Sequence, residues 1–206
     1  MIEIKNKDSG ALLFQAETFE GSKLDGAKWA GADLRELDLS GLKLERADLR
    51  GADLTGAKLV SSDLQGAILS DATLDRADLT NANLTEAIAK HAVLREAILD
   101  GAVTRYATFQ GADFTGASMK GVDASVTDLR GNLNDVDLSN ADVRGADFTG
   151  ANLTGANLTG ANMLDAKLAE AKMARTKMTD SIGPTGRKYG LAPAQTAVKP
   201  WWKFWE

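Results

Sequence analysis

The side chains that could perform acid–base, nucleophilic or metal chemistry in this sequence are either too few or lack the required context. His91 is the only histidine and cysteine is absent, so metal sites built from these two residue types are excluded. Glycines five residues apart imitate part of a phosphate-binding loop, but none is followed by Lys-Ser or Lys-Thr. No nucleophile-elbow or dinucleotide-binding motif occurs in its proper context. We therefore expect no catalytic residues, no cofactor and no metal ion.

Carboxylates are abundant, but their spacing is periodic. Asp33, Asp38, Asp48 and Asp53 each stand directly before a leucine, and the intervals between them are multiples of five residues. Pairing of such carboxylates would arise from the repeat itself and does not indicate a general acid and a general base. The spacing of the aspartates therefore indicates a repeated structural unit and not a catalytic site.

That element is five residues long. Taking the recurring large apolar residue as the centre of each unit, 24 units run from Phe14 to Leu129 and ten more from Leu133 to Met178. An α-helix would scatter such centres over all its faces, and a long strand would alternate them between two faces. A chain that turns after every unit places the centres, and the alanines two residues before them, inside. Sixteen of the 20 glycines stand two residues after a centre, where such a turn needs positive φ.

Segments such as GADLRGADLTGAKL and GADFTGANLTGANLTGANML resemble the pentapeptide-repeat family, and the resemblance covers about residues 12–180. It implies an all-β fold, a right-handed quadrilateral parallel β-helix with four units in each coil. The 34 units would then form about 8.5 coils and a rod roughly 40 Å long. His91 would lie at a solvent-facing corner.

The two ends of the chain depart from the repeat. Residues 1–16 alternate apolar side chains around a turn at Asp8-Ser9-Gly10, which predicts a β-hairpin cap. Residues 17–180 form the predicted β-helix, with a register slip at 129–133. Residues 181–206 are predicted to be an irregular linker and tail ending in PWWKFWE.

Two features depart from the pattern inside the repeat. Some centres are occupied by small residues, and the register slips once. Thr104 and Ala124 fall in one column, where we expect a thinner core, and Phe109 could fill the space beside the small centre Ala89. The slip predicts a kink or a change of twist of the rod at this point. The alternative is a one-residue deletion that the fold tolerates and that serves no purpose.

One coil is apolar at positions that should face water. These residues are Ile88, Val93, Ile98 and Val103, with Ile68 directly below Ile88. Contiguous exposed apolar surface usually marks an interaction site, and incidental exposure is the alternative. A helix over Thr85–Leu99 is a second interpretation, but the five-residue register continues through it and favours the solenoid.

The aromatic tail is the other candidate site. Trp201, Trp202, Phe204 and Trp205 could dock a protein partner, cap the last coil, pair two chains as a homodimer, or lie on a membrane surface.

We interpret the chain as a non-enzymatic protein-interaction scaffold, with a plain structural spacer as an alternative. One branch of the resembling family binds bacterial type II topoisomerases by imitating duplex DNA. The net charge is −5; residues 181–206 carry four basic residues against Glu206 alone, so the remainder carries −8. About two dozen phosphates would line a 40 Å duplex, so topoisomerase binding is disfavoured. The charge does not indicate direct nucleic-acid binding either.

Three features favour a cytoplasmic location. The start, MIEIKNKDSG, lacks the apolar core of a signal peptide, and no stretch approaches the roughly 18 apolar residues of a membrane span. The absence of cysteine fits a reducing compartment.

Overall fold

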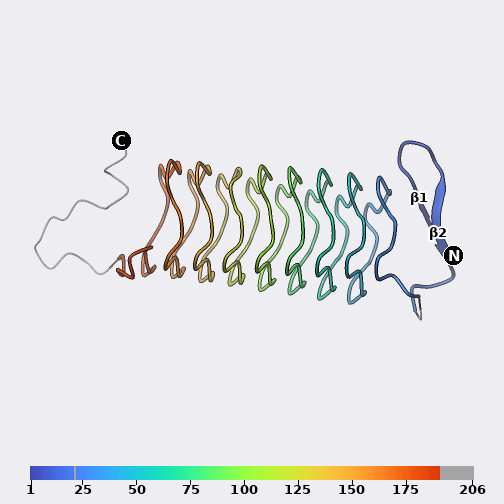
Figure 1. Cartoon of the computed structure of the whole chain (residues 1–206), viewed down its shortest axis with the longest axis horizontal. Helices are drawn as coiled ribbons and strands as arrows, with labels where there is room; N and C mark the ends of the chain where they lie inside the picture. Colours follow the sequence, from blue (N-terminus) through green and yellow to red (C-terminus); the bar gives the residue numbers. More distant parts are fainter. Residues whose placement is uncertain (21, 191–206) are drawn as a thin grey trace, which may run out of the picture.

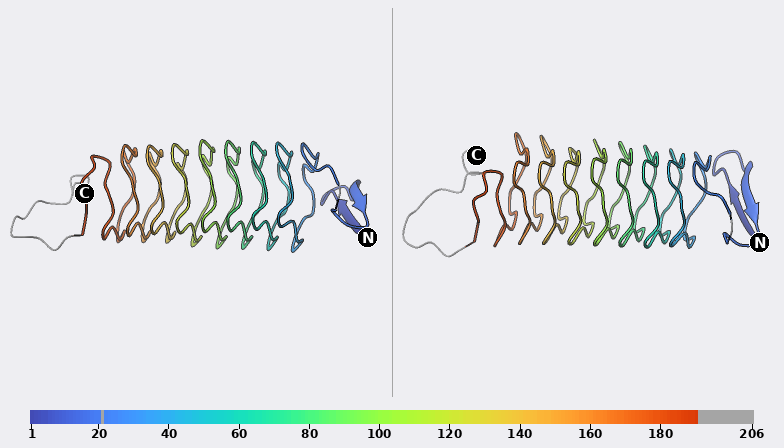
Figure 2. Two further views of the ribbon diagram at one scale, coloured as in Figure 1. Left: turned by 90° about the horizontal axis from the view of Figure 1, so that it is seen from below. Right: turned by 60° about the horizontal axis from the view of Figure 1, so that its bottom comes forward.

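The computed structural model describes residues 1–20 and 22–190. Its two regular strands, β1 (Ile2–Lys5) and β2 (Leu12–Ala16), form an antiparallel hairpin at one end of the molecule (Figure 1). From the hairpin the chain winds through a row of stacked coils toward the opposite end (Figures 1 and 2). The described residues contain no helix.

Parallel bridges connect the coils with a constant register. Outside the slip they join residues 20 apart, such as Asp33 and Asp53, and most bridged residues lie between an inward alanine and an inward centre. The N–H of each centre from Trp29 to Met163 donates to the next coil, as from Leu54 to the carbonyl oxygen of Thr73 at 2.7 Å. The predicted four-sided parallel β-helix is confirmed, and the alternative helix over residues 85–99 is wrong because this segment bridges its neighbours like every other coil.

The core is a set of stacked side chains enclosed by the four sides. Every centre from Leu24 to Met163 is at most 3% exposed. Burying one such leucine contributes about 1.5–3 kcal/mol before the loss of chain entropy. Alanine is the usual residue at the second inward position, although Val136 is also fully buried there beside the centre Leu138.

The hairpin covers the first coils. The N–H of Asp33 donates to the carbonyl oxygen of Lys5 at 2.8 Å, so β1 supplies a partner to an otherwise open edge. Ile4 is fully buried, and the ring of Phe14 packs edge-on against Trp29 with centroids 5.7 Å apart.

The register slip shortens one coil without interrupting the bridges. Across it the bridges span 19 residues, as between Asp113 and Asn132, and the coils continue in one row (Figure 2). Gly131 occupies the inward position that alanine usually holds, and it lacks the positive φ of the corner glycines. A Cβ at Gly131 would lie 2.4 Å from the carbonyl oxygen of Ala112, so glycine is required by close approach.

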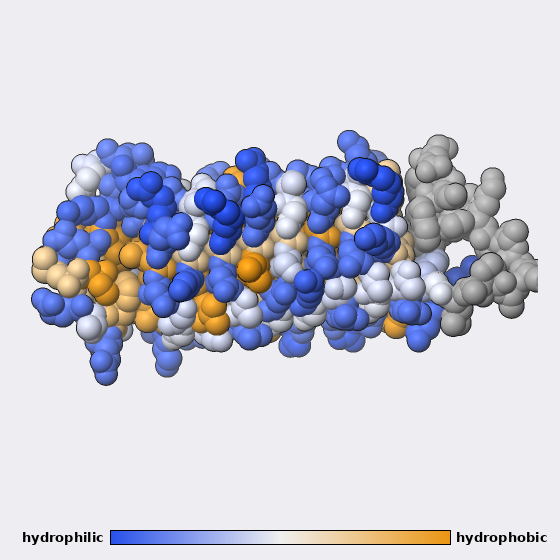
Figure 3. Space-filling model, turned by 180° about the vertical axis from the view of Figure 1, so that it is seen from behind, coloured by the Kyte–Doolittle hydropathy of each residue, from blue (hydrophilic) through white to orange (hydrophobic). Residues whose placement is uncertain are grey.

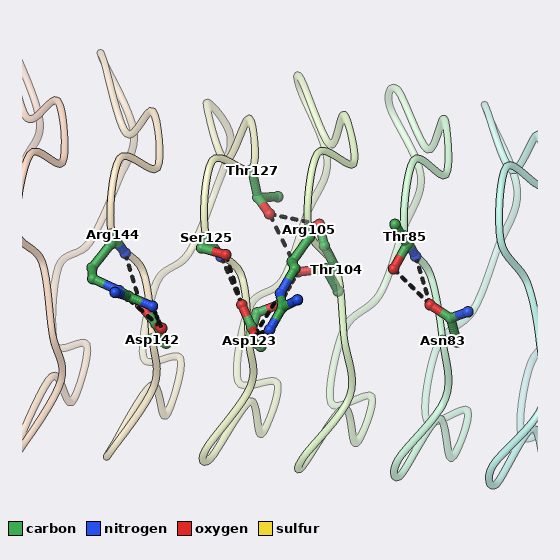
Figure 4. Close-up of polar contacts among 9 residues, drawn as sticks. All are labelled: Asn83, Thr85, Thr104, Arg105, Asp123, Ser125, Thr127, Asp142 and Arg144. Carbon is green, nitrogen blue, oxygen red and sulfur yellow. Dashed lines mark hydrogen bonds and ion pairs between the residues drawn. The ribbon is translucent and has the colours of Figure 1, made fainter.

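The small centres Thr104 and Ala124 are matched by larger residues nearby. Thr127 is buried in an alanine position, and its hydroxyl donates to the carbonyl oxygen of Thr104 at 2.6 Å (Figure 4). In the same coil as Thr104, the rings of Phe109 and Phe114 meet edge to face at 5.1 Å. The two threonine hydroxyls lie 3.5 Å apart, so they form a polar contact inside the core.

Parallel bridging continues as far as Ile182, two residues beyond the expected boundary. The chain then turns back, so that Lys188 pairs antiparallel with Ile182 and the N–H of Tyr189 donates to the carbonyl oxygen of Ser181 at 2.8 Å.

Candidate interaction surfaces

The outward aspartates and asparagines stabilise the corners that follow them. The carboxylate of Asp53 accepts hydrogen bonds from the N–H and the hydroxyl of Thr55 at 3.0 and 2.6 Å. Asn83 and Thr85 form the same pair at 3.1 and 2.7 Å (Figure 4). Such bonds to the backbone two residues on are Asx-type turns, which explains why the repeat favours these residues.

Arginines neutralise many of these carboxylates. In the described part of the chain, six outward aspartates have an arginine nitrogen within 2.7 Å. The hydrogen bond from Arg144 holds the pKa of Asp142 below its usual value. Burial raises the pKa of Asp123, but the hydrogen bonds from Arg105 and Ser125 outweigh it and lower the pKa overall. These two ion pairs lie on consecutive coils (Figure 4).

His91 lies at an exposed corner with φ of 57°. Among residues 1–20 and 22–190, no group of three or more histidine, aspartate or glutamate side chains is placed to hold a metal ion.

The five apolar residues predicted as a binding surface are distributed around the rod. Their bridges assign Ile88, Val93, Ile98 and Val103 to four successive faces, and only Ile68 and Ile88 stack directly. Ile88 and Ile98 are each 41% exposed, and the other three are partly buried. On the face shown in Figure 3, hydrophobic colour beyond the hairpin end occurs in separate small areas. The structure therefore does not bring the apolar coil together as one patch.

A second apolar pair lies on the corner between the faces of Val103 and Ile88. Tyr106 and Val126 occupy this corner in consecutive coils, and they are 61% and 55% exposed. The N–H of Tyr106 lies 3.4 Å from the carbonyl oxygen of Ser125, whereas the other bonds of this corner column are 2.7–3.0 Å. The longest hydrogen bond of the column thus joins the two coils that carry these large side chains. We call this pair the Tyr106–Val126 corner.

The sequence indicates this corner at the turn positions, and not at the outward positions before each centre. Tyr106 and Val126 stand two residues after a centre, where the chain adopts left-handed φ. At the other left-handed positions of the described chain the residue is glycine or a polar residue. Examining this one position for large apolar residues identifies the pair.

The C-terminal end of the rod has a hollow of about 670 Å³. It is lined by Ala166, Leu168, Ala169, Pro184, Thr185, Arg187 and Tyr189.

The predicted tail residues Trp201, Trp202, Phe204 and Trp205 lie outside the described residues. In the part of the chain that the structure describes, no helix is long and apolar enough to cross a bilayer.

The repeat that builds these surfaces is shared with known proteins. The family model for pentapeptide repeats matches overlapping segments that span residues 18–182. The chain belongs to the pentapeptide repeat family. Its right-handed parallel β-helix is the fold of this family, and the bridges between the coils follow it.

Solved pentapeptide repeat proteins are similar to this chain. HetL, involved in heterocyst differentiation regulation in the cyanobacterium Nostoc, is 29% identical over 80% of this chain and 86% of its own, with a TM-score of 0.43. A trypsin-treated form of QnrB1, a plasmid-mediated fluoroquinolone resistance protein, is 19% identical over 75% of this chain and 85% of its own, with a TM-score of 0.50. The likeness to QnrB1 concerns the fold alone. A comparison with curated protein sequences finds no match.

Proposed function

We propose that this pentapeptide repeat protein is a non-enzymatic scaffold that binds a protein partner through the Tyr106–Val126 corner. The observation that carries the proposal is the exposure of two adjacent large apolar side chains, each more than half open to water. Single exposed apolar residues are ordinary, but a contiguous pair on a rigid rod is a surface that a partner can cover. Tyrosine in particular is enriched where interfaces are strongest.

Charged pairs beside this corner supply a polar rim. Arg105 binds Asp123 at 2.7 Å and Arg144 binds Asp142 at 2.6 Å, on the face that also carries Val103. Rim charges of this kind set the register of a partner and its rate of association more than its affinity.

Only some residues of the predicted apolar coil lie on the faces that adjoin this corner. Ile88 and Val103 extend it onto the two adjoining faces, and Ile68 continues it one coil below Ile88. Val93 and Ile98 lie on the other two faces, so only a partner that encloses the rod would contact them.

Binding is tested by affinity capture with the full-length chain as bait. We expect the double variant Tyr106→Ser, Val126→Ser to lose about tenfold or more in affinity for the captured partner, because removal of two apolar side chains from an interface commonly costs more than 1.4 kcal/mol. The measurement is quantitative mass spectrometry of bound proteins, followed by titration of the purified partner.

The matched control changes the diagonally opposite corner. Glu96 and Asp135 have the same left-handed φ of 56°, and both are exposed. The variant Glu96→Ser, Asp135→Ser should retain the partner. Equal retention by both double variants, or loss in the control alone, would contradict the proposal.

The charge distribution argues against imitation of duplex DNA. One outward column begins at Asp33 and Asp53, passes Val93 at mid-rod and ends at Lys172. Arginines also bind four aspartates outside this column. Because a duplex carries about one negative charge per 1.7 Å, this surface lacks the potential that a topoisomerase would recognise.

A further inference from the structure

The last coil of the rod is open on one side. Leu168 and Met173 occupy centre positions but are only partly buried, whereas the centres from Leu24 to Met163 are at most 3% exposed. Within residues 1–20 and 22–190, the backbone N–H groups of Leu168, Met173 and Met178 have no hydrogen-bond acceptor. We call the surface of these three residues the end face. Open apolar side chains and unpaired N–H groups are what a solenoid end must cover.

The hollow of about 670 Å³ adjoins the end face at Leu168. One wall comes from the last coil and the other from Pro184, Thr185 and Tyr189 of the returning chain, at the end opposite the hairpin (Figure 1). Its size falls within the range of pockets that hold compact apolar groups.

The described chain ends beside this surface. A Cβ on Gly190 would lie 2.5 Å from the backbone nitrogen of Asp180, so the chain leaves the rod in contact with its last coil. The 16 residues 191–206 follow. They can extend about 50 Å, whereas one five-residue side of the rod spans at most about 17 Å. The aromatic residues of the tail can therefore reach every part of the end face.

We propose that residues 199–206 of the same chain fold onto the end face and close the rod. Trp201, Trp202, Phe204 and Trp205 cover Leu168 and enter the hollow, and backbone carbonyls of the segment accept hydrogen bonds from the open N–H groups. Each aromatic side chain removes about 150–250 Å² from water when buried. The short connection gives the tail an effective concentration near millimolar, which exceeds that of a second copy at micromolar protein.

Hydrogen exchange of the full-length chain tests this closure. The variant with Ser in place of Trp201, Trp202, Phe204 and Trp205 should exchange the amides of the end face about tenfold faster or more, the change given by 1.4 kcal/mol of lost local protection. The matched control, Lys199→Ser with Lys203→Ser, should leave them unchanged. Amides of interior coils, measured in the same experiment, report whether a variant remains folded.

Tryptophan fluorescence supplies the reciprocal measurement. The variant Leu168→Asp should shift the emission of the tail to the red and increase its quenching by acrylamide, while Trp29 stays buried near the other end. Unchanged exchange in the four-serine variant would overturn the proposal. So would protection that depends on protein concentration together with a doubled mass in light scattering, because a second copy would then cover the end. Emission that responds only to anionic phospholipid vesicles, with unprotected amides, would assign the tail to a membrane surface instead.

Discussion

The corner residues show how far individual side chains depart from the repeat. In the described chain, 17 residues other than glycine hold φ between 54° and 61°, a region that costs an ordinary residue about 1–2 kcal/mol. Fifteen of them are polar, and six of these are Asn or Asp, which tolerate this conformation best. The glycine pattern thus located the corners correctly, but the fold accepts many other residues there because the bonds between coils hold the backbone in place.

Val126 is the β-branched member of this group, so its backbone is the most strained for its residue type. We expect Val126→Gly to raise the free energy of unfolding by about 0.5–1 kcal/mol, because relief of the left-handed strain exceeds the entropy that glycine adds to the unfolded chain. Urea denaturation followed by circular dichroism measures the change.

The reverse substitution at a neighbouring corner is the control. Gly121 has φ of 61° and open space around the position of a Cβ. Gly121→Val should therefore destabilise by about 1–2 kcal/mol through backbone strain alone. If Val126→Gly destabilised the protein, contacts of the valine would outweigh its strain.

At the scale of one coil, the slip is accommodated by a single close backbone contact. The missing residue brings Gly131 into an alanine position, against the carbonyl oxygen of Ala112. The repeat favours alanine at such positions, yet here alanine does not fit.

Gly131→Ala should lower the free energy of unfolding by about 1–3 kcal/mol, because the Cβ must push the two backbones apart. Gly150→Ala is the matched change, since no atom lies within 4 Å of its Cβ position and only the left-handed φ opposes it. Denaturation of both variants in urea gives the comparison. A cost for Gly131→Ala that does not exceed that of Gly150→Ala would show that the slip is more adaptable than its geometry indicates.

At the scale of the whole rod, carboxylates along its surface tie stability to pH. The pKa values of Asp33, Asp48 and Asp142 are lowered, first by a side-chain hydrogen bond from the arginine two residues on. A carboxyl with a lowered pKa binds fewer protons in the folded state, so the free energy of unfolding increases with pH in its titration range. Stability should be constant above about pH 5 and should fall below about pH 4, near the ordinary pKa of aspartate.

Urea denaturation between pH 3 and 7 measures this dependence. Asp142→Asn should weaken it, because one of the contributing carboxyls is removed. Stability that increased as the pH fell toward 3 would contradict the assigned role of the arginine pairs.

Periodicity was sufficient to predict the architecture, because each unit repeats one backbone conformation. Bridges such as Asp113 to Asn132 also follow the outward columns expected for a rod that continues across the slip. The role of Gly131 was not predictable, since it depends on the approach of Ala112 from the coil before. The apolar coil looked contiguous in the sequence, but consecutive units face different sides. The Tyr106–Val126 corner was missed because corner residues were examined for glycine and not for exposed apolar side chains.

The central claim, that a partner binds at this corner, is tested most directly by site-specific photo-cross-linking in the cells that produce the protein. A photoreactive phenylalanine analogue replaces Tyr106 in one sample and Glu96, at the opposite corner of the rod, in another. The account predicts a defined cross-linked protein from position 106, with far less or none from position 96. Equal adducts at both positions, or adducts at position 96 alone, would contradict it.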